Sequence, residues 1–167
     1  SLYNAVNGTS YEDPDDLEVN TLENVLYLSM KNDVSFLIGA DLNLYEHQST
    51  YNPNMPMRGL LYFSKLYETH IDRLEINIYS SAAKTFPFPQ HIVFYNGTKE
   101  EPDRHILRLS DLFSPSQTGK EPCLECTTLM LNINYGHNQA LMEKCRRLEE
   151  YAIFVETVRS YHREDLP

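Results

Sequence analysis

Apolar and polar residues alternate along two adjacent stretches, residues 33–38 and 42–48, with Gly39 and Ala40 between them. Alternation with a period of two is typical of a β-strand whose two faces meet different surroundings. Glycine at the first central position of a two-residue loop favours a hairpin turn. The pattern therefore predicts two antiparallel strands joined by a tight turn.

Other stretches carry the period of a helix or the continuous apolar run of a buried strand. The helix pattern predicts a short helix that ends at Gly8 and two long helices, at 57–71 and 138–161. The strand pattern first covers residues 25–38, either as one strand or as two strands divided at residues 31–32. It recurs at 91–95, 107–109 and 124–133. Residues 9–20 are acidic and predict a loop. This order of helices and strands predicts an α/β fold.

The chain has 167 residues, of which 41% are hydrophobic, so we expect one domain over residues 1–167. The opening helix pattern is too short to be stable alone, and we expect that part of this helix precedes the sequence. No apolar run is long enough to span a membrane, and the first residues lack the basic start of a signal peptide. Three cysteines cannot form a complete disulfide framework, which favours a reducing cytoplasm.

The chain is acidic, because 14 Lys and Arg against 24 Asp and Glu give a net charge of −10. A protein that binds DNA through non-specific phosphate contacts needs a basic surface. If the substrate is a nucleic acid, a metal ion or a local basic strip must therefore offset the repulsion.

The predicted hairpin brings two carboxylates together. If Ile38 pairs with Asp41, counting back along both strands places Asp33 opposite Glu46 on one face of the sheet, and Gln48 shares that face. Like charges at directly opposite positions destabilise a hairpin unless a cation, a shared proton or open water compensates for them. Mg²⁺ is one such cation, since it binds one or two carboxylates together with waters and phosphate. A solvated strand face on which the acids simply happen to fall is the alternative.

A resemblance adds to this argument. The stretch N-D-V-S-F-L-I-G-A-D-L-N-L-Y-E-H-Q-S-T, followed by N-P-N-M-P-M-R and a helix, resembles the recombination-promoting nuclease (Rpn-like) transposase family of bacteria, within the PD-(D/E)XK nuclease superfamily. The similarity extends to L-Y-N-A-V-N-G-T-S-Y, V-F-Y-N-G-T, L-R-L-S-D and L-N-I-N-Y-G-H-N, and so covers most of the chain. It implies a restriction-endonuclease-like core, with a central mixed β-sheet flanked by helices.

The resemblance also implies an activity and a set of site residues. Asp33 matches the first acidic position of the superfamily signature, Glu46 matches the second, and Gln48 stands where the signature has lysine. These matches imply a DNA endonuclease that uses Mg²⁺, or Mn²⁺, held by Asp33 and Glu46. Gln48 can orient a water molecule but cannot neutralise charge, which leaves that task to the metal and to a base such as Arg58, a candidate for contacting the substrate phosphate.

Two alternatives stay open at this point. The acidic balance and Gln48 favour a non-catalytic binding or interaction module with the same fold. Cys123 and Cys126 have the spacing of half a zinc site, although no second pair accompanies them. The oligomeric state is also open, with a homodimer as one option.

Overall fold

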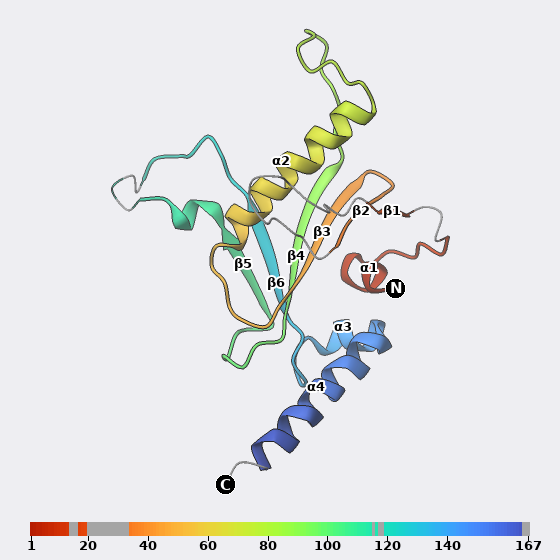
Figure 1. Cartoon of the computed structure of the whole chain (residues 1–167), viewed down its shortest axis with the longest axis vertical. Coiled ribbons are helices and arrows are strands. Elements are labelled where there is room, and N and C mark those ends of the chain that lie inside the picture. Colours follow the sequence, from red (N-terminus) through yellow and green to blue (C-terminus); the bar gives the residue numbers. More distant parts are fainter. Residues whose placement is uncertain (14–16, 20–33, 115, 117–118, 165–167) are drawn as a thin grey trace.

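The computed structural model describes residues 1–13, 17–19, 34–114, 116 and 119–164 of the chain. Within this part, six strands form one mixed sheet in the order β1-β2-β3-β4-β6-β5 (Figure 1). In chain order the strands are β1 (Leu17–Val19), β2 (Val34–Ile38), β3 (Asp41–Gln48), β4 (Phe88–Tyr95), β5 (Arg104–Arg108) and β6 (Thr127–Asn132). Strands β3, β4 and β6 are parallel to one another, while β1, β2 and β5 pair antiparallel with their neighbours. The prediction of an α/β fold with a mixed sheet is therefore confirmed.

Strands β2 and β3 form the predicted hairpin. Ile38 pairs with Asp41, and the register continues unbroken to the pair of Val34 and Tyr45. Gly39 begins the connecting turn with a φ of 57°, in the left-handed region that favours glycine. The predicted register is confirmed over these residues, whereas Asp33 and the predicted strand over residues 25–33 lie outside the described residues.

Helix α2 (Met55–Arg73) connects β3 to the parallel strand β4 and covers one face of the sheet (Figure 1). Pro56 lies in its first turn, where a missing amide hydrogen costs no hydrogen bond. Its inner side packs on β3 in a buried cluster of Leu42, Leu44, Tyr62, Phe63 and Leu66. The helix predicted at 57–71 is confirmed and is two residues longer at each end.

The other face of the sheet is covered by helices from both ends of the chain. These are α1 (Leu2–Asn7), α3 (Gln139–Lys144) and α4 (Arg146–Glu164), and the last extends beyond the end of the sheet in Figure 1. Apolar side chains of these helices and of this face of the sheet form a second buried cluster, which includes Tyr3, Phe36, Tyr45, Phe94 and Leu148. Helix α1 ends as predicted, because Gly8 takes a left-handed conformation with a φ of 68°.

Four predicted elements differ from the structure. The single helix expected at 138–161 is two helices, because Cys145 leaves the helical conformation with a φ of −136° and a ψ of 79°. The loop expected at 9–20 contains β1, which exists because it pairs with β2. The strands expected at 107–109 and 124–133 are β5 and β6, and the 3₁₀ turn η2 (Leu109–Leu112) follows β5 directly.

No helix in the described part of the chain combines the length and the apolar character that a membrane span requires.

Candidate functional site

Glu46 lies near the end of β3, on the face of the sheet that α2 covers. Successive strand residues point to opposite faces, so Glu46 points to the same side as Leu42 and Leu44, which pack against α2. Its side chain is 1% exposed. A carboxylate is rarely buried to this degree unless charged or hydrogen-bonding partners surround it.

Two basic side chains supply these partners. The Arg58 guanidinium, in the first turns of α2, donates from Nη2 to Glu46 Oε2 at 2.7 Å. On the neighbouring strand β4, His91 Nε2 lies 3.2 Å from Glu46 Oε1. Each carboxylate oxygen therefore has a nitrogen partner, one from the helix and one from the sheet.

His91 is itself held firmly. Its Nδ1 lies 2.8 Å from the hydroxyl of Thr128 on β6, and both side chains are buried. Gly59 of α2 packs directly over the ring, since a Cβ atom at that position would lie 2.3 Å from His91 Nδ1. The ring also meets Phe63 edge-on. These contacts fix the imidazole that faces Glu46.

Arg58 is the partner with access to solvent, because its side chain is 33% exposed whereas that of His91 is fully buried. Its Nη2 also contacts the hydroxyl of Tyr62 at 3.2 Å, and its Nη1 lies 3.5 Å from the sulfur of Met55. The guanidinium therefore contacts Glu46, Tyr62 and Met55 while part of the side chain stays exposed to solvent.

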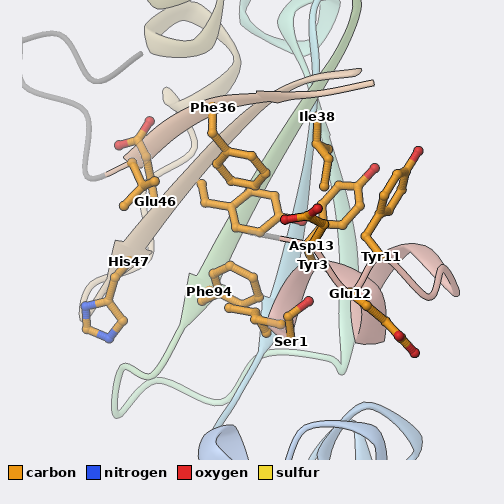
Figure 2. Close-up of a pocket in the computed structure, with 13 residues that line it drawn as sticks. Ser1, Tyr3, Tyr11, Glu12, Asp13, Phe36, Ile38, Glu46, His47 and Phe94 are labelled. Atoms are coloured by element: carbon orange, nitrogen blue, oxygen red, sulfur yellow. The ribbon is translucent and has the colours of Figure 1, made fainter. Parts of the chain in front are cut away.

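The other predicted residues of β3 lie on the faces that the alternation predicts. Gln48 is half-buried and shares the face of Glu46, while Tyr45 and His47 belong to the opposite face. His47 is exposed, and its Nε2 lies 3.3 Å from the hydroxyl of Tyr151 on α4. Figure 2 shows the side chain of Glu46 turned away from the aromatic side chains of the opposite face.

That opposite face contains an apolar cavity of about 560 Å³ between α1 and the first strands (Figure 2). Tyr3, Tyr11, Phe36, Tyr45 and Phe94 are among the side chains that line it. The Tyr3 hydroxyl donates to Asp41 Oδ2 at 2.9 Å. Burial raises the pKa of Tyr45 to about 12, an effect that a hydrogen bond from Asn7 partly offsets. Glu46 also borders this space, although its carboxylate is directed to the other face, toward Arg58 and His91.

The metal expected from the sequence can be tested against the residues that surround Glu46. Among the described residues, no three His, Cys, Asp or Glu gather into a metal-binding group. Asp33, the expected second carboxylate, lies outside the described residues. The two oxygens of Glu46 already have nitrogen partners, Arg58 at Oε2 and His91 at Oε1. The described residues by themselves therefore do not form a site for Mg²⁺.

The cysteines give no sign of a zinc site. Cys123, Cys126 and Cys145 are free thiols, and Cys126 packs beside the cluster of Leu42 under α2. Burial raises the pKa of the Cys126 thiol, and the charge of Glu125 adds to the effect. A raised thiol pKa disfavours the thiolate that a metal would bind.

His91 and Thr128 were not predicted from the sequence as site residues. Two signals point to them in retrospect: a histidine at the start of an otherwise apolar strand, and a glycine within the first turns of a helix that packs on that strand. Neither signal shows that the histidine faces Glu46, because this depends on how β3, β4 and α2 are placed together.

When the chain is compared with family models, with curated proteins and with solved structures, none of them matches it.

Proposed function

We propose that this protein is a metal-dependent DNA endonuclease with a restriction-endonuclease-like core, of the recombination-promoting transposase type in the PD-(D/E)XK superfamily. The observation that supports the proposal most is the buried carboxylate of Glu46, which occupies the second acidic position of the signature. It lies on a hairpin strand, under the helix that follows it, with Gln48 on the same face. Burying a carboxylate costs free energy, and proteins often bear that cost at functional positions.

Each site residue has a proposed role. Asp33 and Glu46 would hold Mg²⁺, or Mn²⁺ in its place, and Gln48 would orient the attacking water by hydrogen bonding. When bound, such a metal lowers the pKa of a coordinated water and offsets charge on the scissile phosphate. Arg58 would bind the phosphate, since guanidinium groups form paired hydrogen bonds with phosphate oxygens. His91 would hold the Glu46 carboxylate in its orientation.

Plasmid nicking tests this proposal. Supercoiled DNA is incubated with Mg²⁺ or Mn²⁺ and with the wild type, Asp33→Ala, Glu46→Ala or a matched control, Glu68→Ala. Glu68 is an exposed carboxylate on the outer side of α2. We expect wild type and Glu68→Ala to nick the plasmid and both site variants to lose at least about a hundredfold in rate. Nicking by Glu46→Ala at the wild-type rate would refute the proposal.

A non-catalytic module with the same fold is the second candidate, and one observation favours it. The carboxylate of Glu46 is 1% exposed and already paired with Arg58, as expected for a structural ion pair. In that case no condition would produce nicking, and Glu46→Ala would change only the stability of the protein. The two candidates therefore differ in the nicking assay with wild-type protein.

We also propose a cytoplasmic location, which the free thiols of all three cysteines support.

A further inference from the structure

Helix α4 has apolar side chains on two of its sides, and the sheet covers one of them. On the inner side, Leu148 and Ala152 are buried in the cluster that faces the sheet. The outer side has a row of four apolar residues at intervals of three, four and three positions, which we call the outer seam: Tyr151, Phe154, Val158 and Tyr161. A helix that is apolar on more than one side is typically covered on each of them.

The outer seam is open to solvent. Phe154 and Tyr161 are 64% and 66% exposed, and Tyr151 and Val158 are each 38% exposed. Figure 1 shows that α4 extends beyond the end of the sheet, which leaves the helix accessible along much of its length. Single apolar residues are common on protein surfaces, whereas a continuous apolar patch is typical of a contact with another molecule.

We propose that the outer seam is an interface between two copies of this protein, in which α4 of one copy packs antiparallel on α4 of the other. Intervals of three and four residues are those at which the side chains of paired helices interlock. A second copy presents the same seam, and a two-fold axis near its middle places Phe154 against Val158 of the partner subunit. The inference does not depend on the proposed function, because it concerns a surface remote from Glu46.

The charges of α4 suit a second copy of the same chain. The protein as a whole has a net charge of −10, so two copies repel each other at most of their surface. Residues 146–162 differ from the rest, because the three arginines and three glutamates in this range cancel. Glu150, which flanks the seam, is also paired with Arg146 at 2.8 Å. The seam therefore lies in a region that does not repel its own copy.

Arg147 favours the antiparallel direction. It lies one turn before Tyr151, at the start of the seam. In an antiparallel pair it comes to the C-terminal end of the partner helix, where unpaired carbonyl groups and the helix dipole attract a cation. In a parallel pair the arginines of the two copies would lie side by side and repel each other.

The size of the seam predicts a dimer of moderate affinity. The four seam side chains expose roughly 400–500 Å² in each copy, given the usual area of such side chains and their exposed fractions. Ile153 and Tyr135 extend the apolar surface beside the seam, where with Tyr161 they line a groove of about 430 Å³. A standard interface takes about 800 Å² from each partner, and smaller interfaces form weaker complexes. We therefore expect a Kd on the order of 10 μM.

Sedimentation velocity of the full chain, from about 1 to 200 μM, tests the interface. The variant is Phe154→Glu, which places a charge on the seam at an exposed position and so leaves the fold intact, as circular dichroism verifies. The matched control is Phe88→Glu, the same change at a phenylalanine of β4 that is 65% exposed. We expect wild type and Phe88→Glu to dimerise as the concentration rises, and Phe154→Glu to stay monomeric. A monomeric wild type at the highest concentration, or equal dimerisation of Phe154→Glu, would overturn the inference.

A mixture of two variants tests the direction of the helices. Val158→Lys should be monomeric alone, like Phe154→Glu, because it also places a charge on the seam. In the antiparallel pair, position 154 of one copy meets position 158 of the other, so the mixture should form a dimer with one pair of opposite charges and one unchanged contact. A parallel pair brings identical positions together and gains nothing from mixing. A mixture that stays monomeric would contradict the antiparallel interface.

Discussion

Gly59 of α2 lies so close to His91 of β4 that a Cβ atom at position 59 would stand 2.3 Å from Nδ1 of the imidazole. The ring cannot retreat easily, because it is buried and has partners at both nitrogens. Glycine therefore sets the distance between the helix and the sheet at the point where the two meet Glu46.

The first prediction follows from this contact. Gly59→Ala should destabilise the protein by about 1–2 kcal/mol, because the cost of overpacking exceeds the gain in helix propensity. Thermal unfolding measures the change as a drop in Tm of roughly 2–8 °C. The control is Ser64→Ala, at an exposed position of the same helix, which should leave Tm unchanged or raise it slightly. A Gly59→Ala protein as stable as the control would show that the helix can shift at no cost.

The second prediction concerns the hydroxyl of Thr128, which lies 2.8 Å from His91 Nδ1 and is buried. Thr128→Val keeps the shape of the side chain but leaves a buried ring nitrogen without its partner, which should cost about 1–3 kcal/mol. Thr127→Val is the control, because Thr127 is the exposed neighbour on the same strand. Its effect should stay within about 0.5 kcal/mol. Urea unfolding measures the stability of both variants. Equal urea midpoints for Thr128→Val and Thr127→Val would show that the hydrogen bond between Thr128 and His91 does not stabilise the protein.

The third prediction is a dependence of stability on alkaline pH. Burial raises the pKa of Tyr45 from 10.0 to about 12, so the unfolded chain loses the phenol proton at lower pH than the folded chain. The stabilisation is complete below the unfolded pKa and is lost as the pH rises from 10 through about 12. The free energy of unfolding should therefore fall over this range. Tyr45→Phe should reduce the slope, and an unchanged slope would show that Tyr45 ionises freely in the folded protein.

The fourth prediction compares two thiols of one motif. Burial and the charge of Glu125 raise the pKa of Cys126, whereas Cys123 is exposed. Because the thiolate is the reactive form, Cys126 should react with iodoacetamide at about pH 8 roughly tenfold more slowly than Cys123. Peptide mapping by mass spectrometry gives both rates. Metal analysis of the purified protein should find no zinc, and zinc together with protection of both thiols would support the zinc alternative instead.

Much of the fold around the site could be predicted from local patterns. Alternation over 42–48 and a glycine at position 39 predicted the hairpin and its register, because a two-residue turn leaves only one way to count the pairs. The same alternation predicted that Glu46 and Gln48 share one face and that His47 belongs to the other. Such features depend only on residues close together in the chain.

Local patterns were less informative where an element depends on a distant partner. The apolar spacing of Met57 and Leu61 helped to predict α2, yet these two side chains are 39% and 42% exposed. The side of α2 that packs on the sheet contains Tyr62 and Phe63. Residues 17–19 were predicted to lie in a loop. They form strand β1 because they pair with β2, and this pairing is not visible in the local sequence. The break at Cys145 likewise has no local signal in an amphipathic pattern that continues through it.

The sequence by itself determined which residues are acidic, where the hairpin turns, and that Glu46 points to one face with Gln48. The tertiary structure decided what Glu46 meets there. Arg58 comes from a helix twelve residues later in the chain, and His91 comes from a strand 45 residues later. No pattern along the chain encodes these distances, because they depend on how α2 packs on β3 and β4. The buried charge is stable only where that packing brings both partners to it.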